Sequence, residues 1–355
     1  MSTRPIELAL TLTPRSRFDV IDVTTAVRER FGDVLAGFRR SAYCSLHTTA
    51  GYLEQSLSAR LDHRRERLDP FMRTFQVLFP PGAGYRHDRL QDRSELSDDE
   101  RRLEPRNADS HLAFIGSGLR NCVTYVNRPG QPVFFMDLDG VNEGHSRTRR
   151  TRVLAYDREE PVATEWCEVP VSRHPIDSIN LADPRSEVLA RGEELIRRHG
   201  VGKGRLEIAL DPAERDAGVT VNEFETLLMR HDLAEVLADP LKFAARTGRR
   251  ILRDPRAIAT KSLGYARYDV VQLLNELMDA LRISESAVER LLARAMAFPA
   301  RRFLRLKRSV SLLVSDRHRT DASVVRGTYQ NPILIQWAAA QGGRRRVVLR
   351  LSRFS

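Results

Sequence analysis

Three histidine-bearing motifs lie in the first third of this 355-residue chain, each in a separate polar segment. His47 stands in the run Leu-His-Thr-Thr-Ala-Gly at residues 46–51, His87 follows a glycine-rich turn, and His111 comes one helical turn after Asn107. Imidazole is the side chain that most often binds a transition metal or transfers a proton near neutral pH. These histidines can share a site only if the fold brings the three segments together, so we expect a fold that does so.

The first 160 residues combine short strands with a few helices. Apolar and polar residues alternate over residues 6–12, which predicts a strand with one solvated face. Further strands are expected over residues 41–46, 122–126, 132–138 and 151–156, and helices over residues 26–31, 57–78 and 108–118. The charged segment 92–105 is interpreted as a solvated loop or a frayed helix. These patterns predict an α+β domain.

The second half has a different predicted secondary structure. Residues 161–175 are rich in proline and charge and are interpreted as a linker between domains 1–160 and 176–355. Helices are expected over residues 183–198, 221–238, 240–252, 268–281 and 284–297, and strands over residues 204–210, 310–314, 333–337 and 346–351. The prediction is a helix-rich, mixed α/β C-terminal domain, and no internal repeat is recognised.

Length and charge limit the class of protein. A chain of 355 residues exceeds the usual size of one hydrophobic core, so two domains are expected. No long apolar run suggests a membrane span or secretion signal, and three widely spaced cysteines suggest no disulfide framework, which predicts a soluble cytoplasmic protein. The net charge of +11 predicts anionic partners.

Residues 301–353 carry thirteen lysines and arginines against Asp316 and Asp321. This basic tail could bind nucleic acid. This segment contains few aromatic residues suited to base stacking, so nucleic-acid binding is the less favoured hypothesis.

A fourth motif completes a family pattern. Residues 134–140 read Phe-Phe-Met-Asp-Leu-Asp-Gly, and Arg147 and Arg149 follow. The four motifs, in this order, resemble the YjbQ-like family, also called secondary thiamine-phosphate synthases. The resemblance covers residues 5–157, and no family is recognised in residues 176–355. It implies a mostly antiparallel, β-sandwich-like α+β domain with two helices, assembled as a homotrimer.

The chain departs from the family pattern in several places. The usual Asn-Glu pair after the first motif is absent, and residues 53–56 read Leu-Glu-Gln-Ser. The usual Gly-Thr-Trp-Gln reads Arg-Pro-Gly-Gln at residues 128–131, and Asp137 stands where the family has glutamate. Retained histidines in changed surroundings indicate either a changed substrate or catalytic decay.

The motifs predict a metal-dependent active site. His47, His87 and His111 are predicted to ligate a divalent metal ion, zinc first and magnesium or manganese as alternatives. Asp137 and Asp139 lie two residues apart on a predicted strand, so both carboxylates share a face and join the histidines as predicted catalytic residues. The predicted substrate-binding residues are Thr48, Thr49, Asn107, Ser117, Gln131, Arg147 and Arg149.

The sequence thus favours a metal-assisted enzyme acting on a phosphate- or pyrophosphate-bearing small molecule. By resemblance, pyrophosphate would leave a pyrimidine carbon and a thiazole nitrogen would replace it, while the metal, Arg147 and Arg149 stabilise the leaving group. Two alternatives remain open: a hydrolase or transferase of a specialised biosynthetic pathway using the same site, and a non-catalytic protein that binds nucleic acid or another polyanion.

Overall fold

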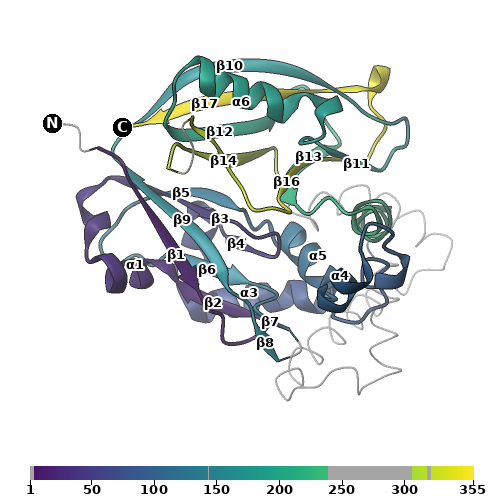
Figure 1. The fold of residues 1–355 in the computed structure, drawn as a ribbon, viewed down its shortest axis with the longest axis horizontal. Helices are drawn as coiled ribbons and strands as arrows, with labels where there is room; N and C mark the ends of the chain where they lie inside the picture. The colour runs from purple at the N-terminus through teal and green to yellow at the C-terminus, as the bar shows by residue number, and fades with distance from the viewer. Residues whose placement is uncertain (1–3, 143, 239–305, 318–320) are drawn as a thin grey trace, which may run out of the picture.

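The computed structural model describes residues 4–142, 144–238, 306–317 and 321–355. Figure 1 shows two β-rich halves, one above the other in this view, with α6 on the outer side of the upper half. The first half ends at β9, and the second begins at β10 only three residues later, so the chain passes from one half to the other by a tight turn.

The first half is built on an antiparallel sheet in the order β1-β9-β3-β5, made of Ile6–Leu12, Arg149–Tyr156, Arg40–Ser45 and Cys122–Val126. A smaller sheet follows the order β2-β6-β4, made of Asp19–Asp22, Phe134–Asp137 and Ala50–Tyr52. The short hairpin β7–β8 joins Val141–Asn142 to His145–Ser146. The helices of this half are α1 (Val23–Phe31), α2 (Gln55–Arg60), α3 (Arg65–Leu78), α4 (Asp98–Leu103) and α5 (Ala108–Ser117).

Local sequence explains where several helices begin and end. The Asp22 side chain accepts a hydrogen bond from the backbone N–H of Thr25 and caps α1. Ser97 and Glu100 form a reciprocal capping box at the start of α4, inside the segment predicted to be a loop or a frayed helix. Gly118 adopts a left-handed conformation and ends α5.

The second half repeats this plan. Its larger sheet has the order β10-β17-β12-β14-β15, made of Glu159–Pro170, Arg344–Phe354, Lys203–Leu210, Ser309–Ser315 and Ser323–Val325. Its smaller sheet has the order β11-β16-β13, made of Asp177–Asn180, Asn331–Gln336 and Ala217–Asn222. The helices here are α6 (Val188–Arg198) and α7 (Leu233–Ala238), which continues from a π-helical turn at Leu228–Asp232.

The two halves match residue by residue in their strand registers. Asp137 pairs with Asp19 and Ala50, and at the equivalent place Gln336 pairs with Asp177 and Ala217. Outside the regular strands, the isolated bridge between Tyr52 and Arg120 has its counterpart between Val219 and Lys307. Shared strand order and shared register show that the chain is a structural tandem repeat, which corrects the expectation of no internal repeat.

The halves pack through the faces of their larger sheets. Ala42, Cys44 and Leu154 of the first sheet form a buried cluster with Leu313 of the second. Tyr156 and Phe354 stack in parallel within this cluster, with ring centroids 3.8 Å apart. The opposite face of the first sheet packs with α1 and that of the second sheet with α6, so the order of layers is helix, sheet, sheet, helix.

Helix α5 lies between the halves and is buried along its whole length. Its apolar side chains share one core with α3 and with residues of the second half such as Leu228 and Ile333. A helix that is buried on all sides must be enclosed by neighbours, and here both halves enclose it. Any polar side chain on α5 is therefore held in a dry environment.

Several expectations from the sequence need correction. The described part of the second half is mainly β-sheet, not helix-rich, and residues 159–170 form β10 instead of a linker. Residues 217–222 are a strand, so the helix expected from residue 221 begins later. The expected helix over 57–78 is divided into α2 and α3. The helices expected over 240–252, 268–281 and 284–297 lie outside the described residues.

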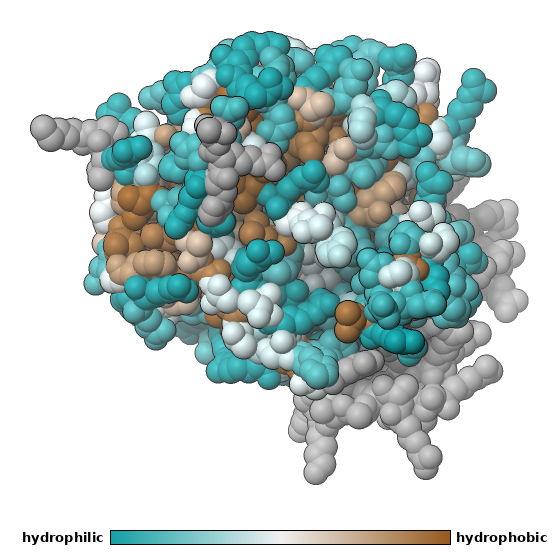
Figure 2. Space-filling model, in the orientation of Figure 1, coloured by the Kyte–Doolittle hydropathy of each residue, from teal (hydrophilic) through white to brown (hydrophobic). Residues whose placement is uncertain are grey.

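In the described part of the chain, no helix is long and apolar enough to cross a membrane. Hydrophilic residues cover much of the face shown in Figure 2, and hydrophobic ones gather mainly on its left, over the region of α1 and β1.

Candidate active site

The candidate site lies where α5, the ends of β6 and β13, and the start of β9 meet. The first half contributes residues from the loop after β3, the turn at His87, the first turns of α5 and the loop between β6 and β9. The second half contributes the segment that follows β13, Asn222 to Glu225, and Asp232. Residues from six separate segments of the chain therefore contribute to the site.

Arg149 and Asp137 form a buried ion pair at the base of the site. The Arg149 guanidinium donates to both Asp137 carboxylate oxygens, at 2.6 and 2.8 Å, and to the Asp139 backbone carbonyl at 2.6 Å. Burial raises the pKa of Asp137, and the bond and charge of Arg149 oppose that rise. Through these bonds of Nε and Nη2, Arg149 fixes the loop between β6 and β9.

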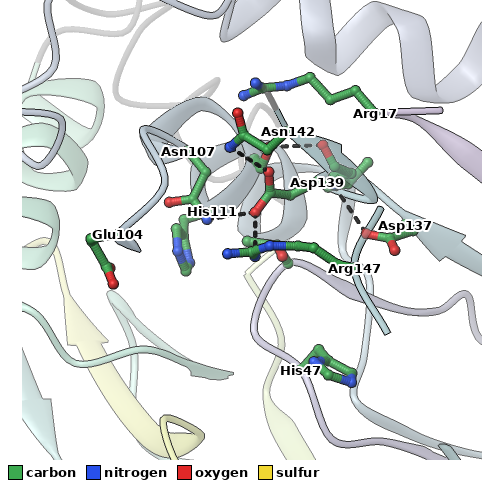
Figure 3. Close-up of polar contacts among 12 residues, drawn as sticks. Arg17, His47, Glu104, Asn107, His111, Asp137, Asp139, Asn142 and Arg147 are labelled. Atoms are coloured by element: carbon green, nitrogen blue, oxygen red, sulfur yellow. Dashed lines mark hydrogen bonds and ion pairs between the residues drawn. The ribbon is translucent and has the colours of Figure 1, made fainter. Parts of the chain in front are cut away.

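Asp139 is the centre of a hydrogen-bond network shown in Figure 3. One of its carboxylate oxygens accepts from Asn107 Nδ2 at 2.7 Å and from Arg147 Nη1 at 2.6 Å, and the other accepts from Asn142 at 3.2 Å. Asp139 is fully buried, whereas about a third of the Arg147 side chain is exposed. The buried Asp139 carboxylate thus fixes the orientation of the Arg147 guanidinium, while part of the Arg147 side chain stays exposed to solvent.

His87 is buried between the halves. Its Nδ1 lies 2.9 Å from Glu225 Oε2, its Nε2 lies 3.3 Å from Asn107 Oδ1, and its backbone N–H donates to Asp232. Burial lowers the pKa of His87, but the hydrogen bond and negative charge of Glu225 outweigh burial, and the net shift is upward. Burial raises the pKa of Glu225, and its bonds from His87 and two backbone N–H groups lower it more. The pair is therefore held as a buried ion pair.

His111 lies next to His87, with ring centroids 5.3 Å apart. Its Nδ1 is 2.6 Å from Asn222 Oδ1, and its Nε2 is 3.6 Å from Glu223 Oε2. Burial, followed by the positive charge of His87, holds the pKa of His111 well below its usual value. Burial raises the pKa of Glu223. His111 is therefore a neutral imidazole that faces a carboxyl group with raised proton affinity.

His47 lies apart from the other two histidines, as Figure 3 shows relative to His111. Its Nε2 accepts from the backbone N–H of Arg150 at 2.7 Å, so the ring proton resides on Nδ1. Burial, together with the charges of Arg149, Arg150 and Arg147, lowers the pKa of His47 to about 3. The ring is a neutral hydrogen-bond donor in a cluster of three arginines.

Two further carboxylates stand at the start of α5. Asp88 accepts from the backbone N–H of Ala108 at 3.0 Å, which satisfies one of the free donors of the helix N-terminus. Asp109 forms an ion pair with Arg17 at 2.9 Å. Burial raises the pKa of Asp109 to about 6, although the Arg17 charge opposes the shift.

The remaining predicted substrate-binding residues divide into two groups. Thr49 is buried with its hydroxyl 3.5 Å from Arg149, and the backbone carbonyl of Thr48 accepts from Asn222. Ser117 instead bonds the Phe114 carbonyl within α5, and Gln131 bonds His63. The structure therefore links Thr48 and Thr49 to the site through hydrogen bonds and shows other partners for Ser117 and Gln131.

The arrangement of donors does not fit the three-histidine metal centre. His87 and His111 lie side by side, but the Nδ1 of each is hydrogen-bonded to a side chain of the second half. His47 Nε2 accepts a hydrogen bond from a backbone N–H. Among the described residues, no group of three or more histidine, cysteine, aspartate or glutamate side chains is placed to hold a metal ion. We therefore derive no catalytic step through a metal ion.

Sequence reasoning missed the second-half residues of the site, Asn222, Glu223, Glu225 and Asp232. A signal was present: Ala217-Gly218 repeats Ala50-Gly51 at the equivalent strand positions, and an Asn-Glu pair follows at residues 222–223. The Asn-Glu pair that the resemblance led us to expect after the first motif thus stands after the equivalent strand of the second half. The fold brings it back to His111.

Comparisons with known proteins give the following. No protein-family model matches the chain, and no curated protein matches it. Among solved structures, a YbjQ-like protein of unknown function from Sulfolobus solfataricus P2 is 14% identical with a TM-score of 0.31, over 55% of this chain and 99% of that one. A hypothetical protein from Aeropyrum pernix K1 is 17% identical with a TM-score of 0.30, over 55% and 100%. An uncharacterised protein of the YjbQ/UPF0047 family from Clostridium acetobutylicum is 12% identical with a TM-score of 0.26, over 54% and 99%.

Proposed function

We propose that this chain is an enzyme that acts on a phosphate- or pyrophosphate-bearing small molecule. The observation that carries the proposal is the neutral His47 ring set among Arg147, Arg149 and Arg150. Burial is the largest cause of the lowered pKa of His47, and the charges of Arg149, Arg150 and Arg147 lower it further; these charges favour a bound anion.

The arginines of this cluster have different roles. Arg149 directs Nε and Nη2 to Asp137 and the Asp139 carbonyl, and its Nη1 lies 3.5 Å from His47 Nδ1. Arg147 is anchored by one Nη1 bond to Asp139, which leaves most of its planar fork for phosphate oxygens. The His47 Nδ1–H, 3.5 Å from Arg149 Nη1, adds a neutral donor to this cluster of arginines. Together they would hold a phosphate group through charge and directional hydrogen bonds.

The buried part of the site supplies acid–base chemistry. His111 is neutral and can accept a proton at Nε2, and Glu223, 3.6 Å away, has a raised pKa and can exchange that proton. Glu223 is the more exposed of the two, so it connects the dry interior to the site. The pair could protonate a leaving group or accept a proton from a nucleophile.

By resemblance to the secondary thiamine-phosphate synthases, the reaction would displace pyrophosphate from a pyrimidine carbon by a thiazole nitrogen. In that scheme Arg147 and His47 would stabilise the departing pyrophosphate. Hydrolysis or transfer on another phosphorylated substrate of a specialised pathway would use the same groups. The divalent metal ion, the trimer and nucleic-acid binding remain predictions from the sequence.

Isothermal titration calorimetry with inorganic pyrophosphate tests the proposal. Wild type is expected to bind pyrophosphate. Arg147→Ala is expected to weaken binding by roughly 30-fold, which is typical when one partner of a hydrogen-bonded charge pair is removed. Arg185→Ala is the matched control, because Arg185 is exposed and pairs only with Asp183. Equal affinity in wild type and Arg147→Ala would overturn the proposed phosphate site.

Two activity assays then separate the reactions. Release of pyrophosphate only when a nitrogen nucleophile is present supports transfer, and release of phosphate from a phosphoester alone supports hydrolysis. In both, His111→Gln is expected to lower kcat more than it changes KM, because His111 is placed to move a proton and not to bind phosphate.

A further inference from the structure

The two halves repeat one framework but do not repeat the site. Arg345 is the counterpart of Arg149 in the strand registers. It donates through Nε to Gln336 and through Nη2 to the Ala338 carbonyl, just as Arg149 donates to Asp137 and to the Asp139 carbonyl. The repeat therefore extends to the side chain that fixes the loop between the last two strands of each half.

At the positions equivalent to Asp139 and Arg147, the second half has no charged side chain. Counted from Gln336 and Arg345, the positions of Asp139 and Arg147 are taken by Ala338 and Gly343. A hollow of about 420 Å³ remains beside Arg345, lined by residues such as Glu214, Arg344 and Arg346. Glu214 binds the Arg345 guanidinium at 2.8 Å, so this buried cation is already neutralised by protein.

The second half instead supplies a chain of hydrogen bonds that reaches Arg147. The Glu225 carboxylate is held by the backbone N–H groups of Leu227 and Leu228 and contacts His87 at 2.9 Å. From His87 the chain continues to Asn107, from Asn107 to Asp139, and from Asp139 to the Arg147 guanidinium.

Donor and acceptor rules fix the orientation of every link. The Asp139 carboxylate only accepts, so Asn107 must turn Nδ2 toward it and Oδ1 toward His87. Both nitrogens of the His87 ring then face acceptors, Asn107 Oδ1 and Glu225 Oε2. If Glu225 stopped accepting, the His87 ring would lose the bond that orients it, and Asn107 Oδ1 would lose the donor that it faces.

We propose that the described residues form one functional site per chain, not two, and that Glu225 of the second half is a positioning residue that orients Arg147 through His87, Asn107 and Asp139. This inference rests on the proposed phosphate site and names the part of the second half that serves it. Among the described residues, the second copy thus has no counterpart of Arg147 and instead holds the Arg147 of the first copy in place.

A double-mutant cycle in the full chain tests it, with inorganic pyrophosphate as the probe. Glu225→Gln keeps the size of the side chain but provides one acceptor oxygen where the carboxylate serves His87 and two backbone N–H groups. Glu225→Gln is expected to weaken pyrophosphate binding by roughly tenfold, the smallest effect usually seen when a residue that orients a ligand-binding side chain is lost. In the Arg147→Ala background the same change is expected to have almost no effect, because the group it orients is gone.

Glu214→Gln is the matched control. It makes the same chemical change in the same half and also removes the charge partner of a buried arginine, but that arginine is Arg345. It should leave affinity unchanged, and wild type should bind one pyrophosphate per chain. Equal losses from Glu225→Gln with and without Arg147, or a stoichiometry of two that falls to one in Glu214→Gln, would overturn the inference.

A readout without ligand separates this inference from the proposed function. In ¹⁵N-labelled protein, the Arg147 side-chain N–H signals should be sharp in wild type and broadened in Glu225→Gln, while Glu214→Gln leaves them sharp. If wild type binds no pyrophosphate but these signals respond as stated, the proposed function fails and the positioning role stands. Unchanged Arg147 signals in Glu225→Gln would reject the positioning role whatever the binding result.

Discussion

Arg149 and Arg345 occupy the same place in the two halves of the chain, 196 positions apart, and each fixes the end of the preceding strand with the same two nitrogens. Their carboxamide and carboxylate partners differ, since Arg149 binds Asp137 and Arg345 binds Gln336. A buried arginine requires nearly all its N–H donors to be satisfied. The two halves meet this requirement with the same arginine nitrogens but with different acceptor side chains.

Neutral His47 gives a direct reporter of the anion site. Because burial and three arginines lower its pKa to about 3, its ring ¹H signals should not move between pH 8 and pH 4.5 in the free protein. A bound pyrophosphate would offset the arginine charges and raise that pKa, so the signals should begin to titrate within this range. The spectrum of His47→Gln assigns the signals. Ordinary titration near pH 6.5 without ligand would contradict the described environment.

Asp109 should make the protein less stable as pH rises. Its pKa is raised from 3.8 to about 6 in the folded state, so the native protein binds the proton more tightly than the unfolded chain does. Stability is therefore highest below pH 4 for this group and falls by about 3 kcal/mol up to pH 6, with no further change above.

Urea unfolding from pH 4 to pH 7 checks this expectation. The stability of Asp109→Asn relative to wild type should improve across the window, because asparagine cannot titrate. Asp98→Asn, on the exposed face of α4, serves as the control. A constant difference between wild type and Asp109→Asn would show that Asp109 has no raised pKa.

The two halves should unfold together. Phe354 is 3% exposed and stacks on Tyr156 across the junction, so Phe354→Ala removes a buried ring from the shared core. We expect a loss of about 3–5 kcal/mol in the free energy of unfolding. Trp166→Ala, at a side chain 58% exposed, should cost far less. Chemical denaturation followed by circular dichroism measures both, and two separate transitions in wild type would indicate independent halves.

Metal content should not depend on His47. After dialysis against zinc and removal of excess, elemental analysis is expected to give the same value for wild type and His47→Ala, because His47 lies apart from His87 and His111 and its Nε2 accepts a backbone N–H. His111→Ala is measured beside it. Stoichiometric zinc that disappears in all three single histidine variants would restore the three-histidine centre and refute the arrangement described above.

Local patterns predicted much of each half but not the repeat. Alternation found β1, β12 and β17, and the apolar run with Gly118 found α5, because these signals lie within the segment itself. The repeat escaped because buried strand positions accept any apolar residue of suitable size: Cys44 of the first half and Ala209 of the second occupy equivalent register positions without being identical.

The site was predicted from one side only. His47, His87, His111 and the residues from Asp137 to Arg149 could be found because they form compact motifs. Glu225 contacts His87 across 138 positions of sequence, and no local pattern carries that information. The metal centre was expected because histidine identity suggests ligation, whereas ring orientation, which decides it, depends on these distant partners.

The short turn between β9 and β10 joins the copies in one polypeptide, and this connection has a genetic consequence. In an assembly of identical subunits every substitution appears in each subunit, so a loss at one site is a loss at all of them. Within a single gene that encodes both copies, alanine could replace aspartate at residue 338 while residue 139 stayed unchanged. Covalent fusion therefore permits the two copies to specialise independently.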